Sequence, residues 1–594
     1  MPAIASVTAG PYIVAVEGDA GPFVVSLSHD STTAGVHHVH LRLRAGRPSR
    51  PGKLLLLWFH PLVDTHLKWF PGCGTDRTVL PEWRSSRVCR SRNTLDAPVY
   101  SLFDSSGRNS LTFALSDATN AVTLAAGVVE ETAEVKCEVA LFTETLPPVS
   151  EYEATLRLDT RPVPYYRALA AVADWWALMR QSLPSHVPEH ARLPMYSSWY
   201  SFHQRVAPES LEHQCKLAKP LGMESIIVDD GWQTDDNSRG YAYCGDWEVA
   251  PAKLPGFAAH VARVHGIGMK YVLWFSVPFV GIHSKAYLRF RDMVLNPAAT
   301  QGWFVLDPRF PDVREYLAGL YESFARKYVI DGFKLDFVDT FELSPEMRDS
   351  LGNGRDIDSV PAAVDALLTD TTERLRAINP DVLVEFRQSY IGPMMRKYGN
   401  MFRAGDVPGD YHGNRVKTID IRLLSGSTPA HSDMVMWNAR DSVESAAMQL
   451  VHTLFAVPQV SVMLDAVPKE HVEMLRHYLA FWRGHRDVLL DGALEPDDPG
   501  MLYTSVSART NEKLLAALYG GGCLSLRAPL PGTIILVNGT FGRRLAFDLA
   551  ESAGRRNVTV TSCMGSVLRR ETVKLPAGIH SIDVPPAGVA LLEA

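Results

Sequence analysis

The chain has 594 residues, a length that favours roughly three or four domains over a single one. It is 46% hydrophobic and 21% charged, which is typical of a folded globular protein rather than a disordered one. A formal net charge of −7 argues against nucleic acid or an anionic membrane as the partner and suits a neutral ligand.

The cysteines are scattered along the chain, and none of the 7 forms a C-x-x-C pair. This spacing predicts neither a disulfide framework nor a zinc site, so we expect reduced thiols in a cytoplasmic protein that needs no metal or cofactor. Residues 1–10 show no basic segment followed by an apolar one, so no signal peptide is predicted. Apolar runs such as residues 53–59 are too short to cross a bilayer, and no membrane association is expected.

The N-terminal part of the chain, residues 1–160, alternates apolar and polar positions in short runs that Gly, Pro and Ser interrupt. Such runs occupy residues 11–16, 24–27, 38–44, 111–115, 122–129 and 135–143. This pattern predicts an N-terminal antiparallel β-sandwich domain. Residues 161–193 follow as a helical linker, with a helix expected over 162–183.

From residue 194 to residue 495, short β-rich runs alternate with helical stretches. The eight β-rich runs are 195–202, 225–228, 270–276, 332–337, 382–389, 401–406, 429–434 and 459–465, and helical stretches include 210–219, 256–265, 313–327, 360–378 and 442–455. Successive β-then-α units predict an α/β fold, a (β/α)8 TIM barrel. Residues 496–594 return to short strands and predict a small C-terminal antiparallel β domain.

The fourth β-rich run ends in a carboxylate, Asp336, which follows Lys334 by two positions. Residues i and i+2 of a strand share a face, so both side chains are expected to point the same way. A cation beside a carboxylate keeps it ionised, and an ionised carboxylate at the C-terminal end of a barrel strand can act as a nucleophile. The alternative is a buried ion pair without chemistry.

Other strand ends of the predicted barrel carry aromatic and charged residues. They are Trp199 on the first strand, Asp229 and Asp230 after the second, Trp274 on the third, Arg387 on the fifth, and Arg403 with Asp406 on the sixth. Tryptophan faces can stack on sugar C–H groups, and carboxylates accept hydrogen bonds from hydroxyls. The set predicts a sugar-binding site, although the tryptophans could instead pack in the core and the paired aspartates could cap a helix.

Two of these carboxylates can form the pair that cleaves a glycosidic bond. Asp336 would stay ionised and attack, whereas Asp406, in a less polar run, would hold a proton and act as the general acid. Asp410, in the glycine-rich loop that follows, is the rival acid. A carboxyl separation of about 5–5.5 Å would give a retaining double displacement.

These motifs resemble the retaining α-galactosidases of glycoside hydrolase family 36, which shares a clan with family 27. The matching segments, in the family's order, are Asp229-Asp230-Gly231-Trp232, Trp274-Phe275-Ser276-Val277-Pro278-Phe279, Leu306-Asp307-Pro308, Gly332-Phe333-Lys334-Leu335-Asp336 and Arg403-Ala404-Gly405-Asp406. The β domains on either side are similar to that family's layout, in a compact form with a short N-terminal domain.

The resemblance implies that Asp336 is the nucleophile and Asp406 the acid/base residue. It also implies a set of residues that hold the sugar. These are Asp229 and Asp230 at the 4- and 6-hydroxyls of galactose, Lys334, Trp199, Trp274, Arg387 and, from the N-terminal domain, Trp69. Arg403 is expected to orient Asp406 or a sugar hydroxyl.

Two departures from the family pattern concern the 2-hydroxyl side of the sugar. Residues 386–393 replace a Cys-Ser-Gly-Gly-Gly run that many members carry after strand five, and Ser276 stands where many have an acidic residue. The expected activity is release of terminal α-linked galactose from small carbohydrates. The alternatives are an α-N-acetylgalactosaminidase, an α-galactosyl transglycosylase and a catalytically silent sugar-binding protein. Homo-oligomerisation, with the β domains as the expected contact surface, is left open.

Overall fold

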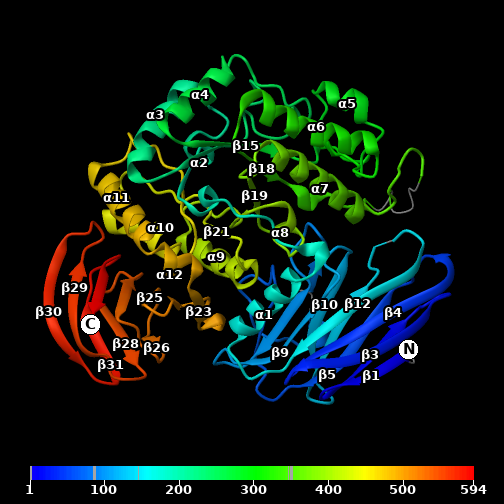
Figure 1. The fold of residues 1–594 in the computed structure, drawn as a ribbon, viewed down its shortest axis with the longest axis horizontal. Helices are drawn as coiled ribbons and strands as arrows, with labels where there is room; N and C mark the ends of the chain where they lie inside the picture. The colour runs from blue at the N-terminus through cyan, green and yellow to red at the C-terminus, as the bar shows by residue number, and fades with distance from the viewer. Residues whose placement is uncertain (1–2, 85–87, 145, 345–346, 348–351) are drawn as a thin grey trace.

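A computed structural model of the chain describes residues 3–84, 88–144, 146–344, 347 and 352–594 (Figure 1). Figure 1 shows two β-rich parts, blue at the N-terminus and red at the C-terminus, on one side of a barrel that helices surround. No helix in the described ranges is long and apolar enough to cross a membrane.

The N-terminal part contains two six-stranded antiparallel sheets that pack as a sandwich, as predicted. The first sheet contains, in spatial order, β1 (Ala5–Ala9), β2 (Tyr12–Gly18), β5 (Leu54–Pro61), β11 (Glu134–Leu141), β10 (Val122–Val129) and β7 (Cys89–Ser91). The second contains β3 (Val24–Thr33), β4 (Val36–Ser49), β12 (Val149–Asp159), β9 (Asn109–Leu115), β8 (Val99–Phe103) and β6 (Leu67–Trp69). Trp58 of the first sheet meets Phe113 of the second edge to face, with ring centroids 4.9 Å apart, in the core between them.

The helix expected over residues 162–183 is shorter in the structure. Helix α1 (Tyr165–Ala177) begins directly after Pro164, whose fixed φ suits a helix start, and a separate 3-10 turn, η2 (Arg180–Ser182), follows it. Trp176 donates its indole N–H to the Leu115 carbonyl at 2.9 Å, which ties the helix to strand β9. Helix α1 also contacts helix α9 of the barrel, so it connects the sandwich to the barrel.

The central part is an eight-stranded parallel barrel, which confirms the predicted TIM-barrel fold. Its strands, in spatial order, are β21 (Ala430–His431), β20 (Met401–Arg403), β19 (Leu383–Arg387), β18 (Gly332–Asp336), β15 (Lys270–Ser276), β14 (Ser225–Val228), β13 (Met195–Ser197) and β22 (Gln459–Val460). Isolated parallel bridges His431–Val457 and Val435–Val460 connect the β21 segment to the β22 segment, the two ends of this order, and so nearly close the barrel. Strands β14 and β18 are buried at every position because helices cover the outside and side chains fill the inside.

Helices follow the strands around the barrel (Figure 1). They are α2 (Trp199–Phe202), α3 (Pro208–Ala218), α4 (Phe257–Ile267), α5 (Lys285–Phe290), α6 (Pro311–Tyr328), α7 (Val360–Ile378), α8 (Met395–Tyr398), α9 (Tyr411–Ser425), α10 (Val443–His452), α11 (Lys469–Gly484) and α12 (Arg486–Asp491). A short hairpin of β16 (Phe279–Gly281) and β17 (Trp303–Val305) lies between β15 and α6 along the chain.

Six of the eight predicted barrel strands extend further than the observed strands, and two of these differences concern the predicted site residues. The first was expected over 195–202, but β13 ends at Ser197 and residues from Trp199 onward form helix α2. The hydroxyl of Ser461 accepts the backbone N–H groups of Tyr200 and Ser201 at 3.0 Å each, so a distant residue satisfies the donors at this helix start. Strand β20 likewise ends at Arg403, which leaves Asp406 in the following loop.

The C-terminal part has a seven-stranded and a three-stranded sheet. The larger contains β23 (Ala493–Asp497), β24 (Ser505–Arg509), β25 (Lys513–Leu518), β27 (Thr533–Asn538), β32 (Val589–Glu593), β29 (Gly554–Thr561) and β30 (Val567–Leu575), and the smaller β26 (Leu524–Leu526), β28 (Arg544–Leu549) and β31 (Gly578–Asp583). Most strand pairs are antiparallel as expected, but β25 pairs with β27, and β26 with β28, in parallel. After β25 the chain leaves the larger sheet and forms β26 in the smaller one. It then returns to the larger sheet as β27, which runs in the same direction as β25.

Candidate active site

Asp336 is the last residue of β18 and is almost completely buried, with 5% of its surface exposed. Its Oδ1 accepts hydrogen bonds from Arg387 Nε at 2.8 Å, from the backbone N–H of Phe337 at 2.9 Å and from the hydroxyl of Tyr390. Its Oδ2 accepts one from the indole N–H of Trp274 at 3.0 Å. Donors on both oxygens fix the carboxyl group in one orientation.

The surroundings of Asp336 favour its ionised form. Burial by itself raises the pKa of this carboxyl group, because the charged form loses its hydration. The positive charges of Arg387 and then Lys334 outweigh that effect, helped by the hydrogen bonds from Tyr390 and Trp274. The pKa of Asp336 therefore lies below its usual value, and the group is a carboxylate at neutral pH.

The predicted pairing of Lys334 with Asp336 needs a correction. The ammonium group of Lys334 bonds Asp229 Oδ2 at 2.6 Å across the barrel, and both side chains are buried. The closest cation to Asp336 is instead Arg387, which stands at the end of the neighbouring strand β19. Lys334 still contributes its charge to Asp336, but as the more distant of two cations.

Asp229 and Asp230 follow β14 directly, and neither caps a helix. Asp230 accepts hydrogen bonds from the side-chain amides of Gln204 at 2.8 Å and Gln233 at 2.7 Å. Burial raises the pKa of Asp230 to about 6, because these neutral donors compensate only part of the lost hydration. The two neighbours thus differ: Asp229 is paired with the cation Lys334, whereas Asp230 has two amide partners.

The three predicted tryptophans differ in how far their rings are exposed and in what they contact. Trp274 is 2% exposed and stacks on Tyr241 with ring centroids 6.4 Å apart, while its N–H binds Asp336. Trp199 is half-buried on helix α2 and has the guanidinium of Arg239 over its ring.

Trp69 has only 1% of its surface exposed and donates its indole N–H to Asp420 of helix α9 at 2.9 Å. This contact joins strand β6 of the sandwich to the barrel. Trp69 also lines a small cavity together with Gln388 and Ile391 of the loop after β19.

Asp406 lies in the loop between β20 and α9, and its side chain is 48% exposed. The guanidinium of Arg403 donates to its Oδ1 at 2.9 Å. Burial raises the pKa of Asp406, but the charge of Arg403 and of two further cations outweighs this and lowers it. The expectation that a less polar setting keeps Asp406 protonated is therefore wrong for the ligand-free protein, because a buried guanidinium lies beside it.

Arg403 is held from several sides and is 1% exposed. It donates to Asp433 Oδ1 at 2.5 Å, and Glu385 Oε1 lies 3.5 Å from its Nε. Asp433 also accepts the Tyr200 hydroxyl at 3.0 Å. These contacts position the guanidinium group that binds Asp406.

The rival acid, Asp410, has a structural role. Its Oδ1 accepts the backbone N–H of Gly413 at 2.9 Å, which makes it the N-cap of helix α9. Asp406 caps no helix, and about half of its side chain is open to solvent.

Sequence reasoning missed several residues that the fold brings to this site. Tyr390, Gln204 and Gln233 lie in loops, and no pattern in the chain points to their contacts with Asp336 and Asp230. Tyr390 lies within the segment 386–393 that departs from the family pattern, which is the one signal that could have drawn attention to it.

Comparison with known proteins finds a family model that matches part of the chain. The family model described as Melibiase matches residues 170–392, which include Asp336 and Arg387. The resemblance to glycoside hydrolase family 36 is confirmed. Within this melibiase segment lie the barrel strands β13, β14, β15, β18 and β19.

Curated relatives match over part of the chain. The bifunctional α-galactosidase/sucrose kinase AgaSK of Mediterraneibacter gnavus is 27% identical over 206 residues, 33% of this chain and 20% of that protein. The α-galactosidase Mel36A of Lactobacillus acidophilus is 27% identical over 163 residues, 26% of this chain and 21% of that protein. The matched region thus spans about a fifth of the length of these relatives.

Solved structures match over nearly the whole chain. The family 36 α-galactosidase AgaA from Geobacillus stearothermophilus, solved as a variant with raffinose, superposes with a TM-score of 0.66 and 14% identity over 98% of this chain and 83% of that chain. The α-galactosidase from Lactobacillus brevis gives a TM-score of 0.64 and 16% identity over 98% and 82%. At this identity, the agreement establishes the fold, a barrel preceded and followed along the chain by β-rich parts.

Proposed function

We propose that the protein is a retaining exo-α-galactosidase that releases terminal α-linked galactose from oligosaccharides or galactosides. One observation carries the proposal: a buried carboxylate with four donors, Asp336, lies at the same end of the barrel as an exposed carboxylate, Asp406, held by Arg403. A binding protein has no need for two carboxyl groups in such different surroundings, whereas a two-step glycosidase uses one of each kind.

In the first step, Asp336 attacks the anomeric carbon while the bond to the leaving oxygen breaks. Its lowered pKa keeps the attacking oxygen unprotonated, and its hydrogen bonds aim it before substrate arrives. A covalent glycosyl-enzyme forms, and the leaving oxygen takes a proton from Asp406.

Asp406 must carry that proton although its pKa is lowered in the ligand-free protein. A sugar that covers its exposed half would remove water from the carboxyl group and raise the pKa. In the second step, Asp406 takes a proton from a water molecule, whose oxygen attacks the anomeric carbon and breaks the bond to Asp336.

The sugar would be held by the buried side of the site. Asp229 and Asp230 are proposed to accept hydrogen bonds from the 4- and 6-hydroxyls, with Lys334 beside them. Trp274, Trp199 and Arg387 would complete the contacts. Burial of the aspartates strengthens each such hydrogen bond, because few water molecules compete for the acceptors.

The proposal is tested with a panel of nitrophenyl α-glycosides and raffinose, with products followed by NMR. Release of free galactose, with the α-anomer formed first, is the expected result. Preferential release of N-acetylgalactosamine would instead favour the α-N-acetylgalactosaminidase. Galactosyl transfer to a second sugar without free galactose would favour the transglycosylase, and no turnover of any compound would favour the silent binding protein.

Three further expectations go with this proposal. A cytoplasmic location, homo-oligomerisation and the division into residues 1–160, 161–193, 194–495 and 496–594 stay predictions from the sequence. Separate expression of residues 1–160 would test the first boundary, since an independent domain should unfold cooperatively by itself.

A further inference from the structure

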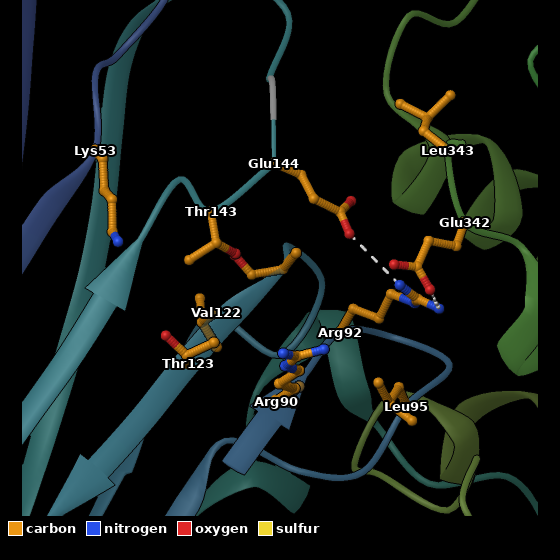
Figure 2. A pocket seen from close by; sticks show the side chains of 12 residues that line it. Lys53, Arg90, Arg92, Leu95, Val122, Thr123, Thr143, Glu144, Glu342 and Leu343 are labelled. Atoms are coloured by element: carbon orange, nitrogen blue, oxygen red, sulfur yellow. Dashed lines mark hydrogen bonds and ion pairs between the residues drawn. The ribbon is translucent and has the colours of Figure 1, made fainter. Parts of the chain in front are cut away.

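A cavity of about 500 Å³ lies between the β-sandwich and the loop that follows β18 (Figure 2). It is lined by the β7 segment with Ser91 and Arg92, by strand β10, by residues 143–144 after β11, and by Glu342 and Leu343 of the barrel. None of the residues proposed to hold the galactose unit lines this cavity. It is thus a concave site apart from those residues, built from two parts of the chain.

The barrel-side wall of the cavity contains a buried guanidinium group. Arg92 is 6% exposed, and its terminal nitrogens lie 3.4 Å from Glu144 and 3.3 Å from Glu342, as the dashed lines in Figure 2 mark. A further hydrogen bond of 2.6 Å to the carbonyl of Asp339 fixes the side chain. The two carboxylates of the cavity are therefore already engaged by Arg92.

Two buried polar atoms at this wall have no hydrogen-bond partner in the described part of the chain. They are Nε of Arg92 and Oγ of Ser91, a residue with 2% of its surface exposed. A buried donor without a partner costs about 1–3 kcal/mol, so such groups are usually satisfied by a ligand or by water. Both atoms belong to residues that line the cavity.

Two more cations, Lys53 and Arg90, line the same cavity and are exposed. Among the residues that the structure describes, neither makes an ion pair with a carboxylate. Figure 2 shows Lys53 entering from the side opposite Arg92, with Arg90 between them. No carboxylate among the described residues neutralises the charges of Lys53 and Arg90, and both side chains border the same cavity.

The lining determines which kind of ligand would fit. Cations favour an oxyanion, and arginine binds phosphate or carboxylate oxygens in a bidentate manner. The hydroxyls of Thr123 and Thr143 and the carboxylates of Glu144 and Glu342 can hydrogen-bond sugar hydroxyls. No aromatic side chain is among the described residues of the lining, which argues against stacking of a neutral sugar.

We propose that this cavity binds a small polyhydroxylated oxyanion, either a sugar phosphate or a sugar acid. The oxyanion would lie against Lys53 and Arg90, close to the buried positive charge of Arg92, and the hydroxyls would point to the threonines and glutamates. This ligand differs in charge from the neutral galactoside proposed for the barrel, so the two sites can be examined separately.

The experiment is isothermal titration calorimetry of the full chain with glucose 6-phosphate, glucuronate, glucose and inorganic phosphate, in excess galactose to fill the barrel site. At least one sugar anion is expected to bind saturably and more weakly as salt is added, while glucose gives no heat of binding. The two anions distinguish a phosphate from a carboxylate ligand. The double variant Lys53→Gln/Arg90→Gln should bind at least about tenfold more weakly, because two charge-assisted hydrogen bonds are lost.

The matched control is Arg47→Gln/Arg50→Gln, which removes the same charge from exposed residues on the same part of the chain that do not line the cavity. Its affinity should equal that of the wild type. Absence of binding by both sugar anions, or equal binding by the Lys53/Arg90 variant, would overturn the site. Inorganic phosphate that binds as tightly as glucose 6-phosphate would overturn the role given to the hydroxyl-binding residues. Galactoside hydrolysis, measured in parallel, is unaffected by any of these outcomes.

Discussion

The two sides of the barrel mouth are built in opposite ways. On the side of β14 to β19, Asp229, Asp230 and Asp336 are each at most 5% exposed and accept hydrogen bonds from fixed donors. On the side of β20 and β21, Asp406 stands in a loop with 48% of its side chain exposed and a single cation, Arg403, as its partner. We call these the buried side and the open side.

This difference matches what the two steps of a retaining reaction require. A nucleophile works best when it stays ionised and aimed, which the donors around Asp336 achieve. An acid/base group must gain and lose a proton in each cycle, so its pKa has to respond to what binds next to it. An exposed carboxyl group that a substrate can cover responds in this way, whereas a buried one with fixed donors cannot.

The largest effect is expected on the buried side from Asp336→Asn, which keeps the shape of the side chain and removes its nucleophilic oxygen. Hydrolysis of nitrophenyl α-galactoside should fall by roughly a thousandfold or more, as when other catalytic nucleophiles are removed. The control is Asp339→Asn, a nearby carboxyl group that makes no hydrogen bond to Asp336 in the described structure. A variant at Asp336 that kept a tenth of the wild-type rate would contradict the assignment.

The next largest effect is expected on the open side from Asp406→Ala. General acid catalysis contributes about 10²–10⁴-fold, and it matters most when the leaving group is a poor one. The variant should therefore lose far more activity on raffinose than in the first step on nitrophenyl α-galactoside, whose leaving group needs no proton. Asp410→Ala is the matched control and should affect both substrates equally and weakly; the opposite ranking of the two variants would make Asp410 the acid.

The protonation of Asp230 offers a test of the buried side by stability. Its folded pKa, raised to about 6, means that the folded state binds the proton more tightly than the unfolded state. The stabilising effect of that proton is present below the unfolded pKa near 4 and is lost as pH rises through about 6. Asp230→Asn should thus gain about 2 kcal/mol in the free energy of unfolding relative to wild type between pH 4 and pH 7. Urea unfolding at both pH values measures this difference, and a gap that does not change with pH would contradict the raised pKa.

A smaller effect is expected from Tyr390→Phe, which removes one donor from Asp336 and leaves Arg387 and Trp274 in place. A hydrogen bond to a charged group is worth about 1.5–3 kcal/mol, so kcat should fall about tenfold to a hundredfold. Because the tyrosine lowers the pKa of Asp336, its loss should also move the acidic limb of kcat/KM to higher pH. A rate loss without this shift would mean that Tyr390 acts by packing alone.

The buried side was easier to predict from the sequence than the open side. The run that ends at Asp336 is apolar and short, so its strand and its place in a parallel barrel follow from local pattern. The partner of Lys334 could not be predicted, because Asp229 comes from another strand and pairing depends on barrel closure. The helix at Trp199 depends likewise on a distant contact, from Ser461. The exposure of Asp406 depends on the end of strand β20 at Arg403, which leaves Asp406 in a loop.

Azide rescue distinguishes a buried carboxylate that attacks from an open carboxylate that transfers the proton. Azide is added to Asp336→Ala and Asp406→Ala with nitrophenyl α-galactoside, and the anomeric configuration of the galactosyl azide is read by NMR. Without its nucleophile, Asp336→Ala should give the inverted β-azide, because azide attacks the substrate directly. With the glycosyl-enzyme still formed, Asp406→Ala should give the retained α-azide. The α-azide from Asp336→Ala and the β-azide from Asp406→Ala would mean that Asp406 is the nucleophile and Asp336 the acid/base residue.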